Sequence, residues 1–379
     1  MHKKEIRNMG FFKRIASVLL AAALLAAPGF AYADGAPDIS SRGAVVIEQT
    51  SGKVLWGKNA HERLPMASTT KIMTALVAIE NSSFDEIVTV PSEAYGTEGS
   101  SMYLALGEKV SMKDLLYGLM LSSGNDAAVA IAVHVGKSVE GFVNMMNERA
   151  RGLGLVNTHF VTPNGLHDDE HYTTAYELAL IAREAMNNET FREIVSTVYY
   201  STETGNSVRY LKNKNKLLWQ YEGATGIKTG YTKAAGKCLV FSADKGGMET
   251  VGVVLNSGNI FVDSANLLNH AHENYQMQTF VSRGDVLARV RVSGSGKKLL
   301  ALTVNEDIIL PVCSYQDSRY ETRVLLDAGV SAPIYTGDVL GYVELYDGTM
   351  LICSAELTAA EDAPKYELAD YLDILFNIW

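Results

Sequence analysis

Ser68 and Lys71 have the residue types and the spacing of an activated nucleophile. They stand at the front of residues 65–80, and the apolar stretch 72–79 predicts a helix buried in a domain interior. Residues three apart lie on the same face of a helix, so the lysine amine can reach the serine hydroxyl. Burial and the positive end of a helix lower the pKa of a lysine, which then keeps a lone pair near neutral pH. Taken alone, however, the pair fits a capping serine beside a lysine that reaches solvent.

Two further short patterns follow in order along the chain. Ser123-Gly124-Asn125 lies in a break between two apolar stretches with helical periodicity, and Lys228-Thr229-Gly230 begins a strand-rich region. An asparagine amide offers both a donor and an acceptor, a second lysine attracts a carboxylate, and a strand glycine leaves room for a peptide alongside. The three patterns in this order indicate a serine enzyme.

This set resembles the motifs of class A β-lactamases and penicillin-binding proteins. The resemblance is closest to the low-molecular-mass penicillin-binding proteins, the serine D-alanyl-D-alanine carboxypeptidases of peptidase family S11, and it covers nearly the whole chain after residue 33. Gly124 stands where class A β-lactamases usually carry Asp, which favours the carboxypeptidases. The stretches 164–167 and 226–232 also resemble that family.

The resemblance implies a role for each matched residue. Ser68 attacks the carbonyl of the penultimate D-alanine of a peptidoglycan stem pentapeptide, Lys71 takes its proton, and water hydrolyses the acyl-enzyme. Penicillin and other β-lactams acylate the same serine as inhibitors. The backbone N–H groups of Ser68 and Tyr231 form the oxyanion hole. The other matched residues relay protons or bind substrate: Ser123, Gly124, Asn125, Lys228, Thr229 and Gly230.

Lys214 stands where the family often has an arginine associated with binding the substrate's carboxylate. A lysine lacks the bidentate fork of an arginine, so the contact would be weaker. A solvated surface charge is an equally good interpretation of Lys214.

Two other functions stay open. A class A-like β-lactamase on the same fold would need a base for deacylation, and Glu170 and Glu177 are candidates, although neither falls in that family's pattern. A catalytically idle protein that binds cell wall as a scaffold is the second alternative. The intact Ser68, Lys71 and Lys228 argue against the scaffold, and the extra C-terminal region argues against a simple β-lactamase.

Histidines and cysteines give no reason to expect a metal or another cofactor. His167 and His171 would share one side only on a helix, and the preceding Pro-Asn-Gly turn favours a surface loop instead. Cys238, Cys313 and Cys353 are too few and too scattered for a metal knuckle or a disulfide framework. We expect them to be small buried apolar residues, with a Cys313–Cys353 pair as the alternative.

The composition, the net charge and the first residues of the chain restrict the possible partners and the location of the protein. The 379 residues are 47% apolar and 20% charged, as in ordinary globular proteins of two or three domains. The net charge of −10, without a basic patch, argues against a nucleic-acid partner. Residues 1–33 combine a basic start, an apolar run too short to span a bilayer and the small-x-small site Ala31-Tyr32-Ala33. They predict a signal peptide and a location in the cell envelope, outside the cytoplasm.

The predicted fold class is α/β. Strand pairs near both ends of residues 34–277, with helices between them, predict an antiparallel sheet covered by helices beside a helical subdomain. The resemblance implies that this is the β-lactamase/transpeptidase-like domain. Residues 278–362 alternate short strands with Gly and Asp turns and predict a small all-β domain. Residues 363–379 form an amphipathic segment that either makes a peripheral membrane contact or packs on the β domain.

Overall fold

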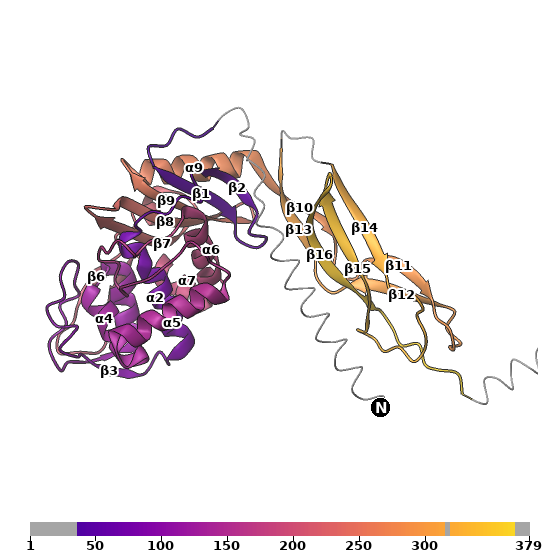
Figure 1. The fold of residues 1–379 in the computed structure, drawn as a ribbon, viewed down its shortest axis with the longest axis horizontal. Coiled ribbons are helices and arrows are strands. Elements are labelled where there is room, and N and C mark those ends of the chain that lie inside the picture. Colours follow the sequence, from indigo (N-terminus) through magenta and orange to yellow (C-terminus); the bar gives the residue numbers. More distant parts are fainter. Residues whose placement is uncertain (1–35, 315–318, 368–379) are drawn as a thin grey trace, which may run out of the picture. The chain divides into compact units, whose positions relative to one another are not determined.

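The computed structural model describes residues 36–314 and 319–367. The predicted signal peptide and most of the predicted amphipathic segment therefore lie outside the described residues. The first region contains an antiparallel five-stranded sheet with strand order β2-β1-β9-β8-β7 (Figure 1). Its strands are β1 (Gly43–Glu48), β2 (Val54–Lys58), β7 (Ala224–Thr232), β8 (Gly236–Lys245) and β9 (Met248–Ser257). Strands from both ends of the region join, as the sequence predicts.

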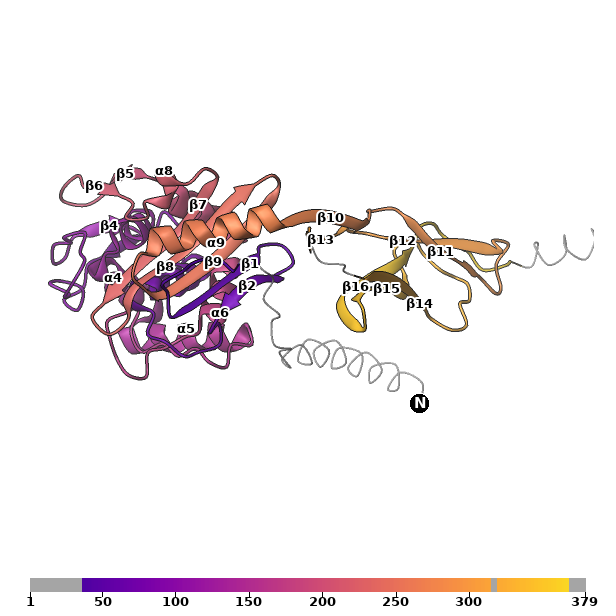
Figure 2. The ribbon, with the colours of Figure 1, turned by 90° about the horizontal axis from the view of Figure 1, so that it is seen from above.

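The two faces of this sheet support separate cores. Val45 and Ile47 of β1 belong to the larger core, whereas Ala44 and Val46 belong to the smaller one, because successive strand residues point to opposite faces. Helix α9 (Ile260–Asn274) covers the smaller core, and α6 (Ala175–Met186) and α2 (Lys71–Asn81) lie on the opposite side (Figures 1 and 2). The predicted sheet covered by helices is confirmed.

The helical subdomain departs from the expected elements in detail. The predicted helix over residues 65–80 begins as the 3-10 turn η2 (Ala67–Thr70). The apolar stretch with helical periodicity before Ser123-Gly124-Asn125 ends in a π turn. The very short strands carry too little periodicity to be predicted. The elements not yet given are β3 (Ile87–Thr89), β4 (Lys109–Ser111), α3 (Met112–Tyr117), η3 (Gly118–Ser122), α4 (Asn125–Gly136), α5 (Val139–Gly152), α7 (Glu189–Ser196), β5 (Tyr199–Ser201), β6 (Tyr210–Lys212) and α8 (Leu217–Gln220).

The C-terminal region has a core of its own, with Leu300, Leu302 and Leu357 fully buried. The strands β10 (Tyr275–Val281) and β13 (Ile308–Cys313) form one pair, and a five-stranded antiparallel sheet has the order β11-β12-β16-β15-β14. The strands of that sheet are β11 (Val286–Arg291), β12 (Leu299–Val304), β14 (Tyr320–Leu326), β15 (Val339–Asp347) and β16 (Met350–Ala359). The all-β expectation is confirmed, although β10 and β13 were not anticipated.

The three cysteines are free thiols. Cys238 and Cys313 are buried, as expected, and Cys353 is partly buried. The alternative Cys313–Cys353 pair is wrong, because neither thiol is joined in a disulfide. Within residues 36–314 and 319–367, no helix has the length and apolar character needed to cross a membrane.

A buried ion pair joins two loops at one end of the helical subdomain. The guanidinium of Arg209 contacts both carboxylate oxygens of Glu108 at 2.8 and 2.7 Å, and its Nε donates to the carbonyl of Met102 at 2.7 Å. The Glu108 side chain is 0% exposed and that of Arg209 12%. The pair therefore links the segment before β4 to the hairpin of β5 and β6.

Replacing Arg209 by methionine is expected to lower the free energy of unfolding by about 3 kcal/mol, because it leaves a buried carboxylate without its cation. Chemical denaturation measures the loss. The control is Arg323→Met, which removes a solvent-exposed pair with Glu321 and should change stability little. Equal effects of the two substitutions would contradict the assignment.

Candidate active site

The predicted pair of Ser68 and Lys71 is brought together at the start of α2. Ser68 lies in η2 and Lys71 is the first residue of α2, and the Lys71 Nζ lies 3.0 Å from Ser68 Oγ. The same Nζ donates to Asn125 Oδ1 at 2.7 Å and to the carbonyl oxygen of Asn164 at 2.6 Å. A neutral amine has two N–H donors and one lone pair. The two carbonyl oxygens match the two donors, which leaves the lone pair for the serine hydroxyl.

Burial favours this neutral form of Lys71. The side chain is 0% exposed, and desolvation holds the pKa of Lys71 well below its usual range. The positive charges of Lys228 and Lys214 lower the pKa further, while Asp126 opposes them. The neutral amine that a general base requires is therefore more accessible to Lys71 than to an ordinary lysine.

The second motif lies where η3 meets α4. Ser123 adopts a left-handed backbone conformation with φ of 63°, and both Ser123 and Asn125 are buried. The Asn125 amide Nδ2 donates to the carbonyl of Glu98 at 2.5 Å, and the Asn125 backbone N–H donates to the carbonyl of Ser100 at 2.7 Å. These contacts fix the Asn125 amide so that its oxygen faces Lys71.

Asp126 is a residue of the site that sequence reasoning missed. Its buried carboxylate accepts hydrogen bonds from the hydroxyl of Ser101 at 2.6 Å and from the backbone N–H groups of Met102 and Leu104 at 3.0 and 3.1 Å. Asp126 therefore anchors the loop that holds Asn125. An acidic residue directly after the Ser-Gly-Asn motif was the available signal.

The third motif lies on β7, the edge strand of the sheet. Lys228 is 1% exposed and its Nζ donates to the Thr229 carbonyl at 2.9 Å. Desolvation, with a contribution from Lys214, lowers the pKa of Lys228 to about 7. A Cβ atom on Gly230 would lie 3.0 Å from the backbone nitrogen of Ser68. The edge of β7 therefore runs directly beside the nucleophile turn, and the following Tyr231 is exposed.

Gly230→Ala is expected to lower the rate of acylation about 10²-fold, because a methyl group would crowd the Ser68 N–H that is expected to stabilise an oxyanion. Stopped-flow mixing with a fluorescent penicillin measures this rate. Gly152→Ala is the control, since nothing lies within 4 Å of a Cβ placed on that glycine and its backbone is not in the left-handed region. An unchanged rate in Gly230→Ala would contradict the proposed oxyanion site.

Lys228→Gln is expected to move the acid limb of the acylation rate to higher pH. The predicted role of Lys71 as the base requires its neutral form, so we expect the rate to rise as pH passes upward through the pKa of Lys71. Removing the Lys228 charge removes one of the causes that lower this pKa, although desolvation remains the largest. A pH profile of acylation tests the direction, and a limb that stays in place or moves to lower pH would contradict the coupling.

Lys214 has features both of a residue that binds a carboxylate and of a solvated surface charge, the two interpretations that the sequence left open. Its surface is largely exposed, yet its Nζ donates to Ser100 Oγ at 2.9 Å and desolvation lowers its pKa. Its charge contributes to the lowered pKa values of Lys71 and Lys228. The ammonium is therefore near the buried lysines and still open to an anionic ligand.

The other candidates take no part in this cluster. The Glu177 carboxylate accepts from the backbone N–H groups of Val156 and Asn157 and from the hydroxyl of Thr158, so it holds the loop after α5. Glu170 is exposed. Among the residues with described positions, no group of three or more His, Cys, Asp or Glu side chains is placed to hold a metal ion. The expectation of a surface loop is wrong for His171, because this side chain is buried. Both of its ring nitrogens have hydrogen-bond partners, which the neighbouring sequence did not reveal.

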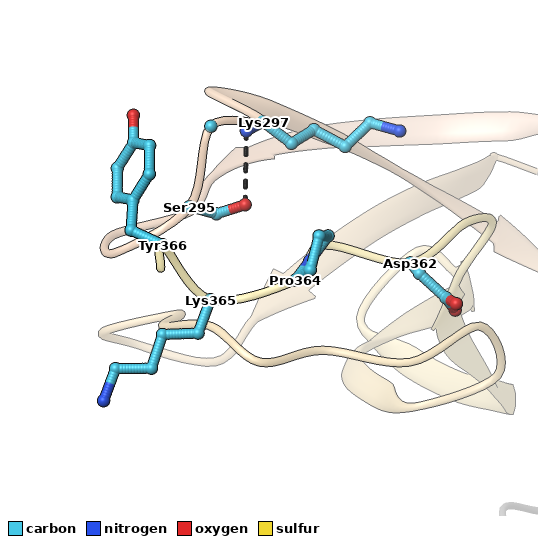
Figure 3. A pocket seen from close by; sticks show the side chains of 7 residues that line it. Ser295, Lys297, Asp362, Pro364, Lys365 and Tyr366 are labelled. Carbon is cyan, nitrogen blue, oxygen red and sulfur yellow. Dashed lines mark hydrogen bonds between the residues drawn. The ribbon is translucent and has the colours of Figure 1, made fainter. Parts of the chain in front are cut away.

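A separate hollow of about 430 Å³ lies in the C-terminal region (Figure 3). It contains none of the predicted site residues. Its lining combines polar, charged and aromatic side chains from two segments: Ser295, Gly296, Lys297, Asp362, Pro364, Lys365 and Tyr366.

Comparison with known proteins adds independent findings. The family model "D-alanyl-D-alanine carboxypeptidase" matches residues 31–259, and "Penicillin-binding protein 5, C-terminal domain" matches residues 275–365. The chain is 34% identical to D-alanyl-D-alanine carboxypeptidase DacF of Bacillus subtilis, over 97% of this chain and 99% of the relative. It is 32% identical to DacA of Escherichia coli, over 91% and 90% of the two chains. The crystal structure of penicillin binding protein 5 from Haemophilus influenzae aligns with a TM-score of 0.75 at 30% identity, covering 88% of this chain and all of that one.

Proposed function

Because the chain belongs to the D-alanyl-D-alanine carboxypeptidase family, peptidase S11, and is a serine-type D-Ala-D-Ala carboxypeptidase, we propose that its reaction proceeds through an acyl-enzyme on Ser68. The observation that carries the proposal is the environment of the Lys71 amine. Two carbonyl oxygens occupy its N–H groups, and the Ser68 hydroxyl lies at 3.0 Å. This arrangement suits transfer of the serine proton to the amine.

Acylation then follows from the positions of the three motifs. As Lys71 takes the proton, Ser68 Oγ attacks the carbonyl carbon of the penultimate D-alanine. The N–H groups of Ser68 and Tyr231 stabilise the negative charge that develops on the carbonyl oxygen. Ser123 relays the proton held by Lys71 to the nitrogen of the leaving D-alanine as the C–N bond breaks. Water then hydrolyses the ester, which releases the carboxylic acid and returns a proton to Ser68 Oγ.

The substrate is held by the opposite wall of the site. Lys228, Lys214 and the hydroxyl of Thr229 attract the terminal carboxylate of the peptide. Asn125 holds its amide, and the edge strand β7 offers its backbone groups to the peptide. Gly124 and Gly230 instead allow close packing of the protein itself, since a Cβ on them would meet Asp126 and the Ser68 turn. Penicillin acylates Ser68 in the same position.

We extend the proposal to location and organisation. Members of the family act outside the cytoplasm, and residues 1–33 would direct this chain there as a signal peptide. Residues 34–277 would form the catalytic domain and 278–362 a separate β domain, a division supported by their independent cores. Ala363 is buried in the core of the β domain and the Tyr366 N–H donates to the carbonyl of Gly294, so the start of the segment 363–379 packs on that domain. Its remainder, residues 368–379, would provide a peripheral membrane contact.

One pair of assays tests the function. The purified protein is incubated with a fluorescent penicillin and, separately, with diacetyl-Lys-D-Ala-D-Ala. A long-lived adduct together with free D-alanine is the expected result. Rapid hydrolysis of penicillin would instead indicate a β-lactamase, which is disfavoured because the oxygens of Glu177 are occupied by hydrogen bonds elsewhere. The absence of both adduct and D-alanine would indicate a scaffold.

A further inference from the structure

Thr70 and His171 lie outside the three motifs and form a hydrogen-bond chain behind the nucleophile. His171 Nε2 lies 2.7 Å from Thr70 Oγ1, and Thr70 Oγ1 donates to the carbonyl oxygen of Ala67 at 2.8 Å. All three residues are buried, and Ala67 directly precedes Ser68. The chain therefore reaches from a loop distant in sequence to the peptide that leads into the nucleophile.

The partners of the imidazole define its tautomer. The backbone N–H of Val161 donates to His171 Nδ1 at 2.9 Å, so Nδ1 must carry a lone pair. Since the Thr70 hydroxyl gives its own hydrogen to Ala67, Nε2 must carry the proton and donate it to Thr70. Each group in the chain thus donates once in the same direction, and a protonated Nδ1 would break the contact with Val161.

The turn that this chain holds is under backbone strain. Ala67 has a φ of 49°, in the left-handed region that non-glycine residues adopt at a cost and keep only where their surroundings enforce it. Two hydroxyl groups bind the carbonyl oxygens of the peptide groups before and after the Ala67 Cα atom. Thr69 Oγ1 donates to Met66 O at 2.6 Å, and Thr70 Oγ1 donates to Ala67 O. Without these hydrogen bonds, the Ala67 backbone would shift out of the left-handed region, and Ser68 would be displaced with it.

The loop that carries His171 also touches the base. Asn164 of this loop supplies the carbonyl that accepts from Lys71 at 2.6 Å. A Cβ on Gly165 would lie 2.0 Å from the carbonyl oxygen of Ala67, so the loop rests directly on the nucleophile turn. One loop thus positions both the turn of the nucleophile and the amine of its base.

We propose that His171 and Thr70 are positioning residues for acylation, which hold the Ser68 turn in the geometry that its reaction with Lys71 requires. This inference rests on the proposed role of Ser68. Burial lowers the pKa of His171 to about 4; Asp168 opposes the shift, and His159, His167 and Lys71 add to it. The imidazole is therefore neutral at neutral pH.

The test compares Thr70→Val, which removes the hydroxyl at nearly constant shape, with Thr70→Ser, which keeps it. Stopped-flow acylation by a fluorescent penicillin separates the binding constant from the acylation rate constant. Thr70→Val is expected to lower the rate constant about 10²-fold with little change in binding, as a small misplacement of a reacting group does. Thr70→Ser should stay within about twofold of the natural protein, and His171→Leu should resemble Thr70→Val. The double variant should be no slower than either single one, because both substitutions break the same chain.

A matched pair elsewhere controls for stability alone. Thr250 Oγ1 and His272 Nε2 lie 3.3 Å apart between β9 and α9, on the other face of the sheet. Thr250→Val removes the same type of contact and should leave acylation unchanged. Equal slowing by Thr70→Val and Thr250→Val, or failure of Thr70→Ser to retain activity, would overturn the inference.

Two further measurements keep the outcomes separate. Nitrogen-15 NMR of the imidazoles in the natural protein should show His171 protonated at Nε2 and not at Nδ1, and the opposite tautomer would overturn the proposed chain even if the variants failed to fold. If Ser68→Ala still forms the adduct, the proposed function fails. If Ser68→Ala forms none while Thr70→Val acylates normally, only the positioning role fails.

Discussion

Ser68→Ala is expected to form no covalent adduct with penicillin and to lower kcat/KM for D-alanine release by about 10⁴-fold or more, as loss of the nucleophile does in other serine hydrolases. The substitution removes the oxygen that forms the ester and leaves Lys71 with its two carbonyl partners. Fluorescent labelling followed by mass spectrometry of the intact protein measures the adduct, and release of D-alanine measures turnover.

Ser82→Ala is the control for this experiment. The Ser82 hydroxyl donates to the carbonyl of Ala78 at the far end of α2, so its loss should not change labelling. An adduct of normal stoichiometry in Ser68→Ala would contradict the assignment of the nucleophile, and the modified peptide would then identify the true one.

Lys71→Gln is expected to lower the acylation rate about 10³-fold and to remove its acid limb. Glutamine has a similar length and can still donate to the carbonyl oxygens of Asn125 and Asn164, but it has no basic lone pair for the Ser68 proton. General-base catalysis of this kind contributes about 10² to 10⁴ in rate. In the natural protein the rate should rise with pH through the lowered pKa of Lys71, whereas in the variant it should lack that titration.

Lys233→Gln provides the matched control, because Lys233 is an exposed lysine close to the end of β7. Its pH profile should follow that of the natural protein. If Lys71→Gln kept the acid limb, a different group would have to be the base.

The parts of the site that depend on local geometry were predictable from sequence. The spacing of Ser68 and Lys71 works because residues three apart meet across one helical turn, even though η2 is a 3-10 turn there. Local geometry could not predict that Lys228 lies beside this pair, because the contact of β7 with η2 joins segments that are far apart in the sequence. That prediction came from the resemblance of the three motifs to a known family.

The residues that were missed make long-range contacts without a motif. Thr70 and His171 are separated by 101 positions, and only the folded loop brings them together. His171 stands among acidic residues, which suggested a solvated turn, but two hydrogen-bonded nitrogens allow an imidazole to be buried. Asp126 directly follows the Ser-Gly-Asn motif, but its contacts with Ser101, Met102 and Leu104 form only when the chain folds.

Lys71 and Lys228 also make the free energy of unfolding depend on pH, because both lysines release protons when the chain folds. None of the three acceptors around the Lys71 amine is a carboxylate, so its charged form has no counter-ion in direct contact. In the unfolded chain a lysine titrates near 10.5, whereas Lys228 in the folded chain titrates at about 7 and Lys71 well below 10.5. Between the folded and unfolded values the unfolded chain binds more protons, so this contribution to the free energy of unfolding rises with pH and is smallest below the folded pKa values. The reactive state of the base is thus maintained at the expense of native stability, a trade between activity and thermodynamic robustness that is set by the same buried amines.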